Sequence, residues 1–582
     1  MNVDKPDKKV IKRFHALQEK RRQLLALEPK EAMARILDDP QPVALVHSFP
    51  EQDFYFLIHE IGPEDALPLL SLASNRQWDH LADLDTWHKD QIDIRAVSRW
   101  LDLLLEADPQ RFINWCLNER LEFVELYLFK NIEVRIREHD QDPSEFGEEF
   151  FSLDHTYFIR VVDQPPDAAQ TQITEEQRKK FINRLVESLS EFDFRKFQGV
   201  LLEAAHVIPA EAEEECYRMR NVRLAEKGFL PFDEAIGIYQ PVKPEDLAGQ
   251  SAKSLPSRAD PASLYPVPMY PIRMLAQDNH FTRALAALEP QHLLPHIQAE
   301  FANLCNQIIV ADHKTIRERD QLREIVKKAC GYLSIGLERL SAEKEKPAPQ
   351  RNAALITRHP LQQIFRVGFG EALKLKWRTE KWFDHCWFAG KGLRLTFWGE
   401  NWLGVLGGLL IKKPLFYDNY KTGVLYREFA CLEEVRATEA VFNRIKAVDE
   451  LLSLMAVEID PPASYGFLTY KNLILTLWAA DYLHLPGRKL RPVNLKKFRK
   501  FFKDLLPGGT EPGADQPRTI PQEMKDHFLN WLAGNTGLKD FEISRRLGPT
   551  LENIFEEIEG ELGRVAAEDL DPRYVQLFLL EE

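Results

Sequence analysis

The chain has 582 residues, of which 44% are hydrophobic and 29% charged, a composition typical of a globular protein rather than a disordered or collagen-like one. This length exceeds what one hydrophobic core usually serves, so about three or four domains are expected. The formal net charge of −14 argues against a general nucleic-acid-binding protein, because a polyphosphate would be repelled except at a local basic patch.

The cysteines and the apolar runs bear on the cellular compartment of the protein. Six cysteines are spread along the chain without a CxxC pair, which is typical of reduced thiols rather than of disulfides or a zinc site: Cys116, Cys216, Cys305, Cys330, Cys386 and Cys431. The N-terminus is charged from Asp4 onward and has no apolar signal-peptide core. The longest apolar run, from Trp402 to Ile411, is far shorter than the roughly 20 residues of a membrane span. We therefore expect a cytoplasmic protein without a transmembrane segment.

Residues 48–70, SFPEQDFYFLIHEIGPEDALPLL, contain two helix starts in close succession. Ser48 and Glu51 have the spacing of a capping box. The apolar positions that follow form one stripe at helical spacing: Phe54, Leu57, Ile58 and Ile61. Gly62 is expected to end this helix, and Pro63 is expected to open the next.

The same kind of start recurs at Asp39–Pro40 and at Asp108–Pro109. Between them, one helix face carries Val97, Trp100, Leu101, Leu104 and Leu105. Helices of about ten residues must bury their stripes against neighbours, and a succession of short antiparallel helices is typical of α-solenoids. We predict an irregular α-superhelix over residues 30–145. This run of PEDALPLL-like helix starts resembles the intracellular superhelical domain of MgtE-type magnesium transporters, without implying transport, because the membrane part is absent.

Beyond the superhelix the pattern changes. Residues 148–163, EEFFSLDHTYFIRVVD, predict a small hairpin with its turn at Asp154–His155. The following QPPDAAQTQ is interpreted as a linker into helices from about Thr174 to Ile208.

A helical hairpin is predicted within residues 213–241, where a first helix ends at Gly228 and Pro231 leads into a second. Its sequence RLAEKGFLPFDEAIGIY resembles an uncharacterised family of large bacterial proteins classed as a domain of unknown function, and the hydrophobic C-terminal half is similar to that family as well. The resemblance implies a bacterial cytosolic protein and provides no established activity.

Three Pro-rich stretches divide the chain, and the strongest boundary is 241–268. The predicted fold class is mainly α, with a solenoid-like N-terminal region and a larger helical C-terminal region that contains a few short strands. The predicted organisation is a charged N-terminal segment (1–29), the superhelix (30–145), a hairpin and helical-hairpin region (146–240), a linker (241–268), a helical C-terminal domain (269–505) and a C-terminal helical subdomain after a Pro/Gly-rich loop (506–582).

Two clusters of polar residues are candidate sites. The stretch 78–93 offers possible ligands of a divalent ion, namely Asp79, His80, Asp83, Asp85, His88 and Asp90, but it fits neither an EF-hand nor an HExxH helix. A solvated acidic turn is favoured and no metal is predicted. The arginines Arg218, Arg220 and Arg223 could bind a phosphate or carboxylate, whereas Glu214, four residues before Arg218, favours pairing within the protein.

Residues 487–506 interleave basic and aromatic side chains, a pattern that can bind RNA or an anionic membrane. The candidate binding residues are Lys496, Lys497, Arg499 and Lys500, but the surrounding phenylalanines favour an ordinary amphipathic helix with a basic solvated face.

Residues 381–402 contain Asp384, His385 and Cys386 in succession and four tryptophans nearby: Trp382, Trp387, Trp398 and Trp402. Cys–His catalysis needs the two groups brought together in space, usually from distant segments, so a bulky core is favoured over a catalytic site.

No phosphate-binding loop, dinucleotide fingerprint or nucleophile elbow is present. The sequence therefore gives no positive case for an enzyme, and no cofactor is predicted. The preferred interpretation is a non-catalytic scaffold or adaptor that binds another protein, with no specific nucleic acid. The alternative is an enzyme or small-ligand-binding protein with a site near the aromatic segment 381–402.

Overall fold

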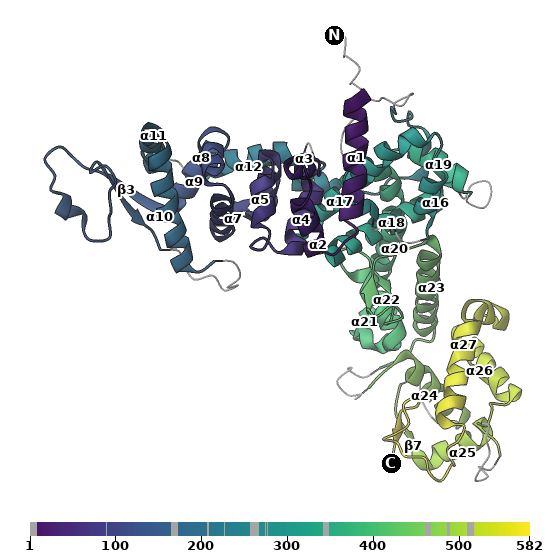
Figure 1. The fold of residues 1–582 in the computed structure, drawn as a ribbon. Helices are drawn as coiled ribbons and strands as arrows, with labels where there is room; N and C mark the ends of the chain where they lie inside the picture. Colours follow the sequence, from purple (N-terminus) through teal and green to yellow (C-terminus); the bar gives the residue numbers. More distant parts are fainter. Residues whose placement is uncertain are drawn as a thin grey trace. The chain divides into compact units, whose positions relative to one another are not determined.

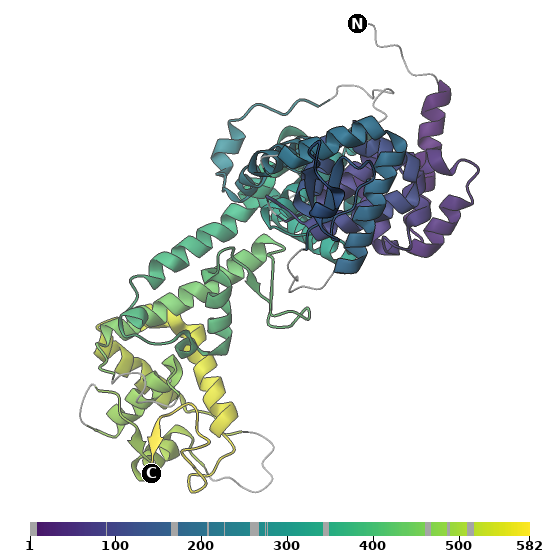
Figure 2. The ribbon, with the colours of Figure 1, turned by 90° about the vertical axis from the view of Figure 1, so that its left-hand side faces the viewer.

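The computed structural model describes residues 8–88, 90–163, 173–206, 209–225, 227–255, 267–273, 275, 278–341, 348–459, 467–485, 489–508 and 517–582. The predicted linker 164–172, part of the 241–268 stretch and Arg488 of the basic stretch lie outside these residues. The chain forms two compact units, Met1–Gly368 and Phe369–Glu582. Both consist mainly of helices with a few short strands (Figures 1 and 2), which confirms the prediction of a mainly α protein.

The first half of the first unit consists of short helices with two small antiparallel sheets. Its elements are α1 (Lys8–Leu24), α2 (Pro29–Leu37), α3 (Pro42–His47), α4 (Glu51–Ile61), α5 (Leu67–Leu72), α6 (Asn75–Asp85), β1 (Trp87–His88), β2 (Gln91–Ile92), α7 (Ile94–Ala107), α8 (Pro109–Asn118), α9 (Leu121–Asn131), β3 (Ile132–Ile136), a 3₁₀ turn (Pro143–Phe146), β4 (Tyr157–Val161), α10 (Glu175–Phe192) and α11 (Phe194–His206). Helix α4 packs against α2 and α6, and α5 packs against α3 and α7, so each short apolar stripe is covered by neighbours.

Two predicted helix boundaries in this region are confirmed, while two others are displaced: α5 starts at Leu67 rather than at Pro63, and α3 starts at Pro42 rather than at Pro40. Helix α4 ends before Gly62, whose φ of 101° is accessible to glycine at little cost. Asp108 caps α8 by accepting from the main-chain N–H of Arg111. The capping box at Ser48 is wrong: Ser48 ends α3 and its hydroxyl donates to the carbonyl of Leu45, while α4 starts after Pro50 without a side-chain cap.

The hairpin predicted within 148–163 is present, but the longer pairing of its second strand is with a strand outside that segment. Phe151 bridges Ile159 in the antiparallel sense, and the turn between them contains His155 with φ of 56°. The longer ladder pairs β4 with β3, in the register Ile132 with Val161. Residues 132–136 fall within the predicted superhelix but form a strand. The sequence does not reveal this strand, because a local pattern contains no information about a partner that lies beyond a loop.

The second half of the first unit contains longer helices. Its elements are α12 (Pro209–Ala225), α13 (Phe232–Ala235), a 3₁₀ turn (Ile236–Tyr239), α14 (Pro244–Ala248), α15 (Tyr270–Arg273), α16 (His280–Ala286), a 3₁₀ turn (Gln291–Leu293), α17 (Leu294–Ala311), α18 (Arg319–Ser341), α19 (Pro349–Arg358) and α20 (Leu361–Phe383), within which the unit boundary falls. The predicted helical hairpin of 213–241 corresponds to α12 followed by α13.

The second unit continues from α20 with α21 (Trp387–Gly390), a 3₁₀ turn (Leu395–Trp398), α22 (Gly399–Leu410), β5 (Phe416–Tyr417), β6 (Tyr426–Arg427), α23 (Leu432–Leu454), α24 (Tyr470–Tyr482), β7 (Val493–Asn494), α25 (Leu495–Leu505), α26 (Gln522–Thr536), α27 (Asp540–Leu562) and β8 (Leu580–Glu581). The β5–β6 pair is antiparallel and the β7–β8 pair is parallel. No helix among the described residues is long and apolar enough to cross a membrane.

The glycines of α22 allow the β5–β6 hairpin to lie directly on the helix. A Cβ at Gly404 would overlap the ring of Tyr417, and one at Gly408 would meet the carbonyl of Leu415. The hydroxyl of Tyr426 donates to the carbonyl of Gly404 at 3.0 Å. The apolar run that was too short for a membrane span is thus a helix covered by a hairpin.

We expect Gly404→Ala to lower the free energy of unfolding by about 1–3 kcal/mol, because the added methyl group must displace the Tyr417 ring. Gly534→Ala in α26 is the matched control, since its Cβ would meet nothing within 4 Å, and the gain in helix propensity should be neutral or stabilising by about 0.5–1 kcal/mol. Urea unfolding followed by tryptophan fluorescence measures both changes. Equal stability of the two variants would contradict the proposed contact.

Candidate functional site

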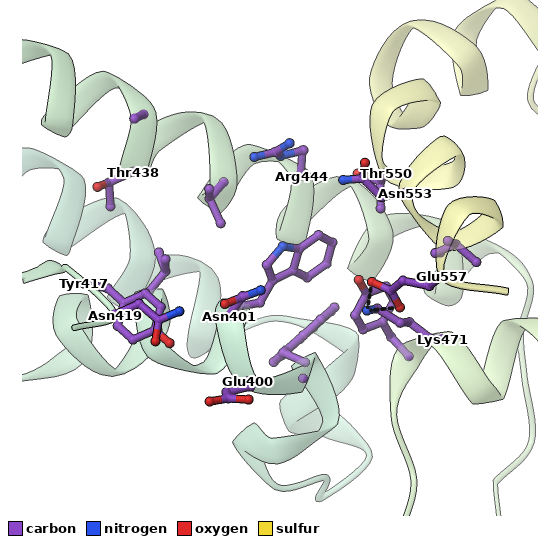
Figure 3. A pocket seen from close by; sticks show the side chains of 18 of the residues that line it. Glu400, Asn401, Tyr417, Asn419, Thr438, Arg444, Lys471, Thr550, Asn553 and Glu557 are labelled. Carbon is purple, nitrogen blue, oxygen red and sulfur yellow. Dashed lines mark hydrogen bonds and ion pairs between the residues drawn. The ribbon is translucent and has the colours of Figure 1, made fainter. Parts of the chain in front are cut away.

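A cavity of about 770 Å³ lies within the second unit, among α22, β5, α23, α24 and α27. The aromatic segment predicted as a possible site contributes Trp398 and Trp402 to its lining. Figure 3 shows the side chains converging from these elements, with Arg444 on one side and the Lys471–Glu557 pair on another.

Aromatic rings form one wall of this cavity. The Trp402 and Tyr470 rings are stacked, with centroids 4.6 Å apart and planes 2° apart. Trp398 lies against both, at 6.0 Å from Trp402 and 5.9 Å from Tyr470. Thr469 holds Tyr470 in place by capping α24 in a capping box with Asn472. Such a rigid aromatic wall can pack against a planar ring.

Several hydrogen-bond donors on the lining have no partner among the described residues. The guanidinium of Arg444 makes neither a hydrogen bond nor an ion pair there, and its Nε is buried. The indole Nε1 of Trp398 and the hydroxyl Oγ1 of Thr550 are likewise buried and unpartnered. Burying a polar group without a partner costs about 1–3 kcal/mol, so three such groups around one cavity call for an explanation.

One acid on the lining is already paired. Lys471 Nζ lies 2.5 and 2.6 Å from the two carboxylate oxygens of Glu557 (Figure 3). Burial raises the pKa of Tyr470, with the charge of Glu557 adding to this effect, so its hydroxyl stays protonated. A guanidinium group donates and does not accept, and a ligand that pairs with Arg444 must therefore supply acceptors.

The neighbouring triplet of residues 384–386 does not form a catalytic pair. Cys386 is buried, its Sγ lies 3.3 Å from the carbonyl of Phe383, and burial raises the pKa of its thiol. The exposed His385 places Nδ1 3.1 Å from the carbonyl of Lys381. Asp449 instead organises this segment by accepting from the main-chain N–H groups of Trp387 and Phe388.

Four of the five carboxylates of 78–93 are engaged within the protein, while Asp90 is exposed. Asp79 accepts from Trp115 and Arg120, and Asp85 accepts from Tyr55 at 2.8 Å and Trp100 at 3.0 Å. The expected solvated turn is wrong for Asp83 and Asp85, because both are buried on helix α6. The described part of the chain contains no group of three or more His, Cys, Asp or Glu side chains that could hold a metal ion.

The three arginines of α12 have different partners. Arg218 pairs with Glu215, not with Glu214 as the spacing had indicated. Arg223 forms two hydrogen bonds of 2.8 Å with the carboxylate of Asp83. Burial alone would raise the pKa of Asp83, but Arg223 and the charge of Arg120 hold it below its ordinary value. Arg220 lines a second cavity, in the first unit.

The basic stretch forms the amphipathic helix α25. Phe498, Phe501 and Phe502 are buried, while Lys496, Lys497 and Lys500 are exposed and make no ion pair with a described residue. Arg499 donates to the carbonyl of Glu568 at 2.9 Å. The structure thus places these candidate residues on one surface, and their binding role stays a prediction.

Sequence reasoning missed Arg444, Tyr470 and Thr550, which lie on three different helices. Each falls in an ordinary helical pattern, so only the spatial convergence identifies it. The one sequence signal was the cluster of tryptophans in 381–402, two of which, Trp398 and Trp402, line the cavity.

The geometry defines a mainly α-helical protein of two units, with a donor-rich aromatic cavity in the second. Residues 9–581 match the sequence model of the Family of unknown function (DUF6178), and the chain belongs to this family. Comparisons with curated proteins and with solved structures found no match.

A buried histidine gives the first unit a pH dependence. His80 is fully buried and neither ring nitrogen has a hydrogen-bond partner among the described residues. Burial, with a smaller effect from the charge of Lys227, lowers its pKa well below the ordinary value. The unfolded chain binds this proton near pH 6.5 and the folded chain does not, so stability must fall as the pH drops through that value.

We expect His80→Leu to reduce the pH dependence of the free energy of unfolding by up to about 1.4 kcal/mol per pH unit, because unfolding of this variant takes up as much as one proton fewer. Urea unfolding at pH values between about 8 and 5 measures the slope. The control is His139→Gln, whose side chain is fully exposed at 103%. A wild-type slope in His80→Leu would show that other groups carry the pH dependence.

For α25 we expect no salt-sensitive binding of the wild-type chain to RNA, DNA or anionic vesicles, because the net charge of −14 opposes a polyanion. Titrations at increasing salt measure this, since polyanion binding must weaken as counterions are released. The prediction would be wrong if the chain bound one of these polyanions with an affinity that falls steeply with salt, and if a variant with Lys496, Lys497 and Lys500 changed to Gln no longer bound it.

Proposed function

We propose that the protein binds a small organic anion, rich in hydrogen-bond acceptors and containing a planar ring, in the cavity of the second unit. The observation that carries this proposal is the guanidinium of Arg444, which lies on the cavity lining without a hydrogen-bond or ion-pair partner among the described residues. A phosphate or carboxylate suits a guanidinium in both charge and geometry. A planar ring suits the wall formed by Trp402 and Tyr470.

The size of the cavity supports the same proposal. Its volume of about 770 Å³ lies within the range of roughly 300–1,000 Å³ that is usual for small-molecule sites. The lining combines apolar and aromatic walls with a few polar groups, which is the general composition of such sites. The proposal is for binding; it assigns no reaction.

A second candidate is the protein-interaction scaffold predicted from the sequence. The pairwise stacking of α2 to α7 is compatible with the superhelix and with the MgtE-like resemblance, both of which stay predictions. Exposed apolar side chains favour a contact surface in the second unit, where Leu454 is 50% and Phe541 61% exposed. Leu454 borders a small crevice with Leu538 and Ile543, and exposed apolar groups of this kind are typical of protein contacts.

The proposed site of action is the bacterial cytoplasm. All six cysteines are free thiols, and five of them are buried. Free buried thiols are usual in a reducing compartment.

We expect Arg444→Gln to weaken binding of ring-containing anions about tenfold or more, because a charge-assisted hydrogen bond is lost. Titrations with nucleoside monophosphates and pyridine dicarboxylates, followed by tryptophan fluorescence, measure this effect. The uncharged nucleosides serve as matched ligands whose affinity should change little.

Arg436→Gln is the control variant, since Arg436 is an exposed residue of the same helix α23 and does not line the cavity. Identical behaviour of the two arginine variants, or no binding by any anion of the panel, would contradict the proposed function. Crosslinking in native lysate tests the scaffold: a partner captured by wild type and Arg444→Gln but lost with Leu454→Lys and Phe541→Lys would favour it instead.

A further inference from the structure

A second cavity, of about 590 Å³, lies entirely within the first unit. It is bordered by α4, the end of α6, β1, α12, residues 229–233 and the C-terminal end of α17. Aromatic and aliphatic side chains make up much of its wall, among them Tyr55, Phe56, Leu84, Phe229 and Ile309. An apolar ligand body can be buried against such a surface.

Arg220 brings a guanidinium to this apolar wall. Its Cζ lies 5.8 Å from the ring centroid of Trp87 and 5.9 Å from that of Tyr217, both of which also line the cavity. Its Nε donates to the main-chain carbonyl of Asp83 at 2.6 Å, and its Nη1 donates to the side chain of Asn221 at 3.2 Å. The remaining nitrogen, Nη2, has no hydrogen-bond partner in the described chain.

The charge of Arg220 is not matched by a carboxylate of its own. The carboxylate of Asp83 is occupied by Arg223, with Arg120 at 3.5 Å. Arg120 also pairs with Asp79 at 2.7 Å. The carboxylates of Asp79 and Asp83 are therefore neutralised by Arg120 and Arg223. The positive charge of Arg220 is left without a carboxylate partner among the described residues. Burial lowers the pKa of Arg220, with Asp83 opposing the effect, which fits a desolvated cation that gains from an anionic partner.

The rim of the cavity limits the charge of that partner. Lys314 is exposed there and makes no ion pair with a described residue, while Asp90 and Asp233 are exposed on the same lining. The rim thus adds no excess positive charge, and the site offers one unpaired guanidinium. One guanidinium matches one carboxylate in a bidentate or single hydrogen bond, whereas a phosphate dianion would remain half-neutralised.

We propose that this cavity is a second ligand site, for an apolar monocarboxylate, with the carboxylate on Arg220 and the hydrocarbon or aromatic body against Tyr55, Phe56 and Phe229. The site is independent of the one in the second unit, since it shares no lining residue with it. Neighbouring Trp87 reports on occupancy by fluorescence.

The test compares naphthoic acid, its uncharged methyl ester and naphthyl phosphate on the full chain, in the wild type and in Arg220→Gln. We expect Arg220→Gln to weaken naphthoate binding about tenfold or more, because the charge-assisted hydrogen bond is lost, while ester binding changes less than about twofold because its apolar contacts are kept. The control Arg218→Gln, on the same helix but paired with Glu215, should change neither. Hydrogen-exchange protection of residues 213–225 and 229–233 by naphthoate, retained in Arg444→Gln, assigns the effect to this cavity.

Three results would overturn the proposal. The first is unchanged naphthoate affinity in Arg220→Gln, and the second is equal loss of acid and ester, which would make Arg220 a packing residue. The third is tighter binding of naphthyl phosphate than of naphthoate to the wild type, which would refute the assignment of a monocarboxylate as the ligand. A melting curve of Arg220→Gln that matches the wild type establishes that lost binding is not lost folding.

Discussion

Helix starts leave main-chain N–H groups without an intrahelical partner, and in this protein carboxylates from distant helices satisfy several of them. Asp53 on α4 accepts from Met269 and Tyr270 at the start of α15. Glu300 on α17 accepts from Leu361 at the start of α20 at 2.7 Å. Asp449 on α23 does the same for α21 and so fixes the aromatic segment that leads to Trp398. These contacts join remote parts of the chain and also stabilise the helix ends electrostatically.

Each of the two cavities, by contrast, is lined by one arginine that no carboxylate of the described chain satisfies. Arg444 and Arg220 both lack a carboxylate partner among the described residues, and each lines a cavity with aromatic walls. The two sites differ in the partner proposed for the guanidinium. In the first it is a planar anion rich in acceptors, against the stacked rings of Trp402 and Tyr470; in the second it is a monocarboxylate whose apolar body lies against aromatic side chains.

The same distinction between local and remote contacts explains how much the sequence could predict. Caps that lie within a few residues of their helix, such as Asp108 and Thr174, leave a local signal, and those helices were predicted. The start of α20 follows Pro360 and takes its cap from Glu300, a partner that no local pattern reveals. The candidate site divides in the same way: the tryptophans formed a visible cluster, whereas Arg444 and Thr550 became site residues only by folding.

The acidic character of the whole chain is compatible with binding small anions at these points. Charges separated by more than a Debye length, about 8 Å at physiological salt, are largely screened from each other. A polyanion contacts a wide surface and is repelled by the net charge of −14. The binding of a single carboxylate or phosphate inside a cavity depends mainly on the guanidinium that it contacts. Short-range geometry therefore decides which anion binds, and the net charge decides which is excluded.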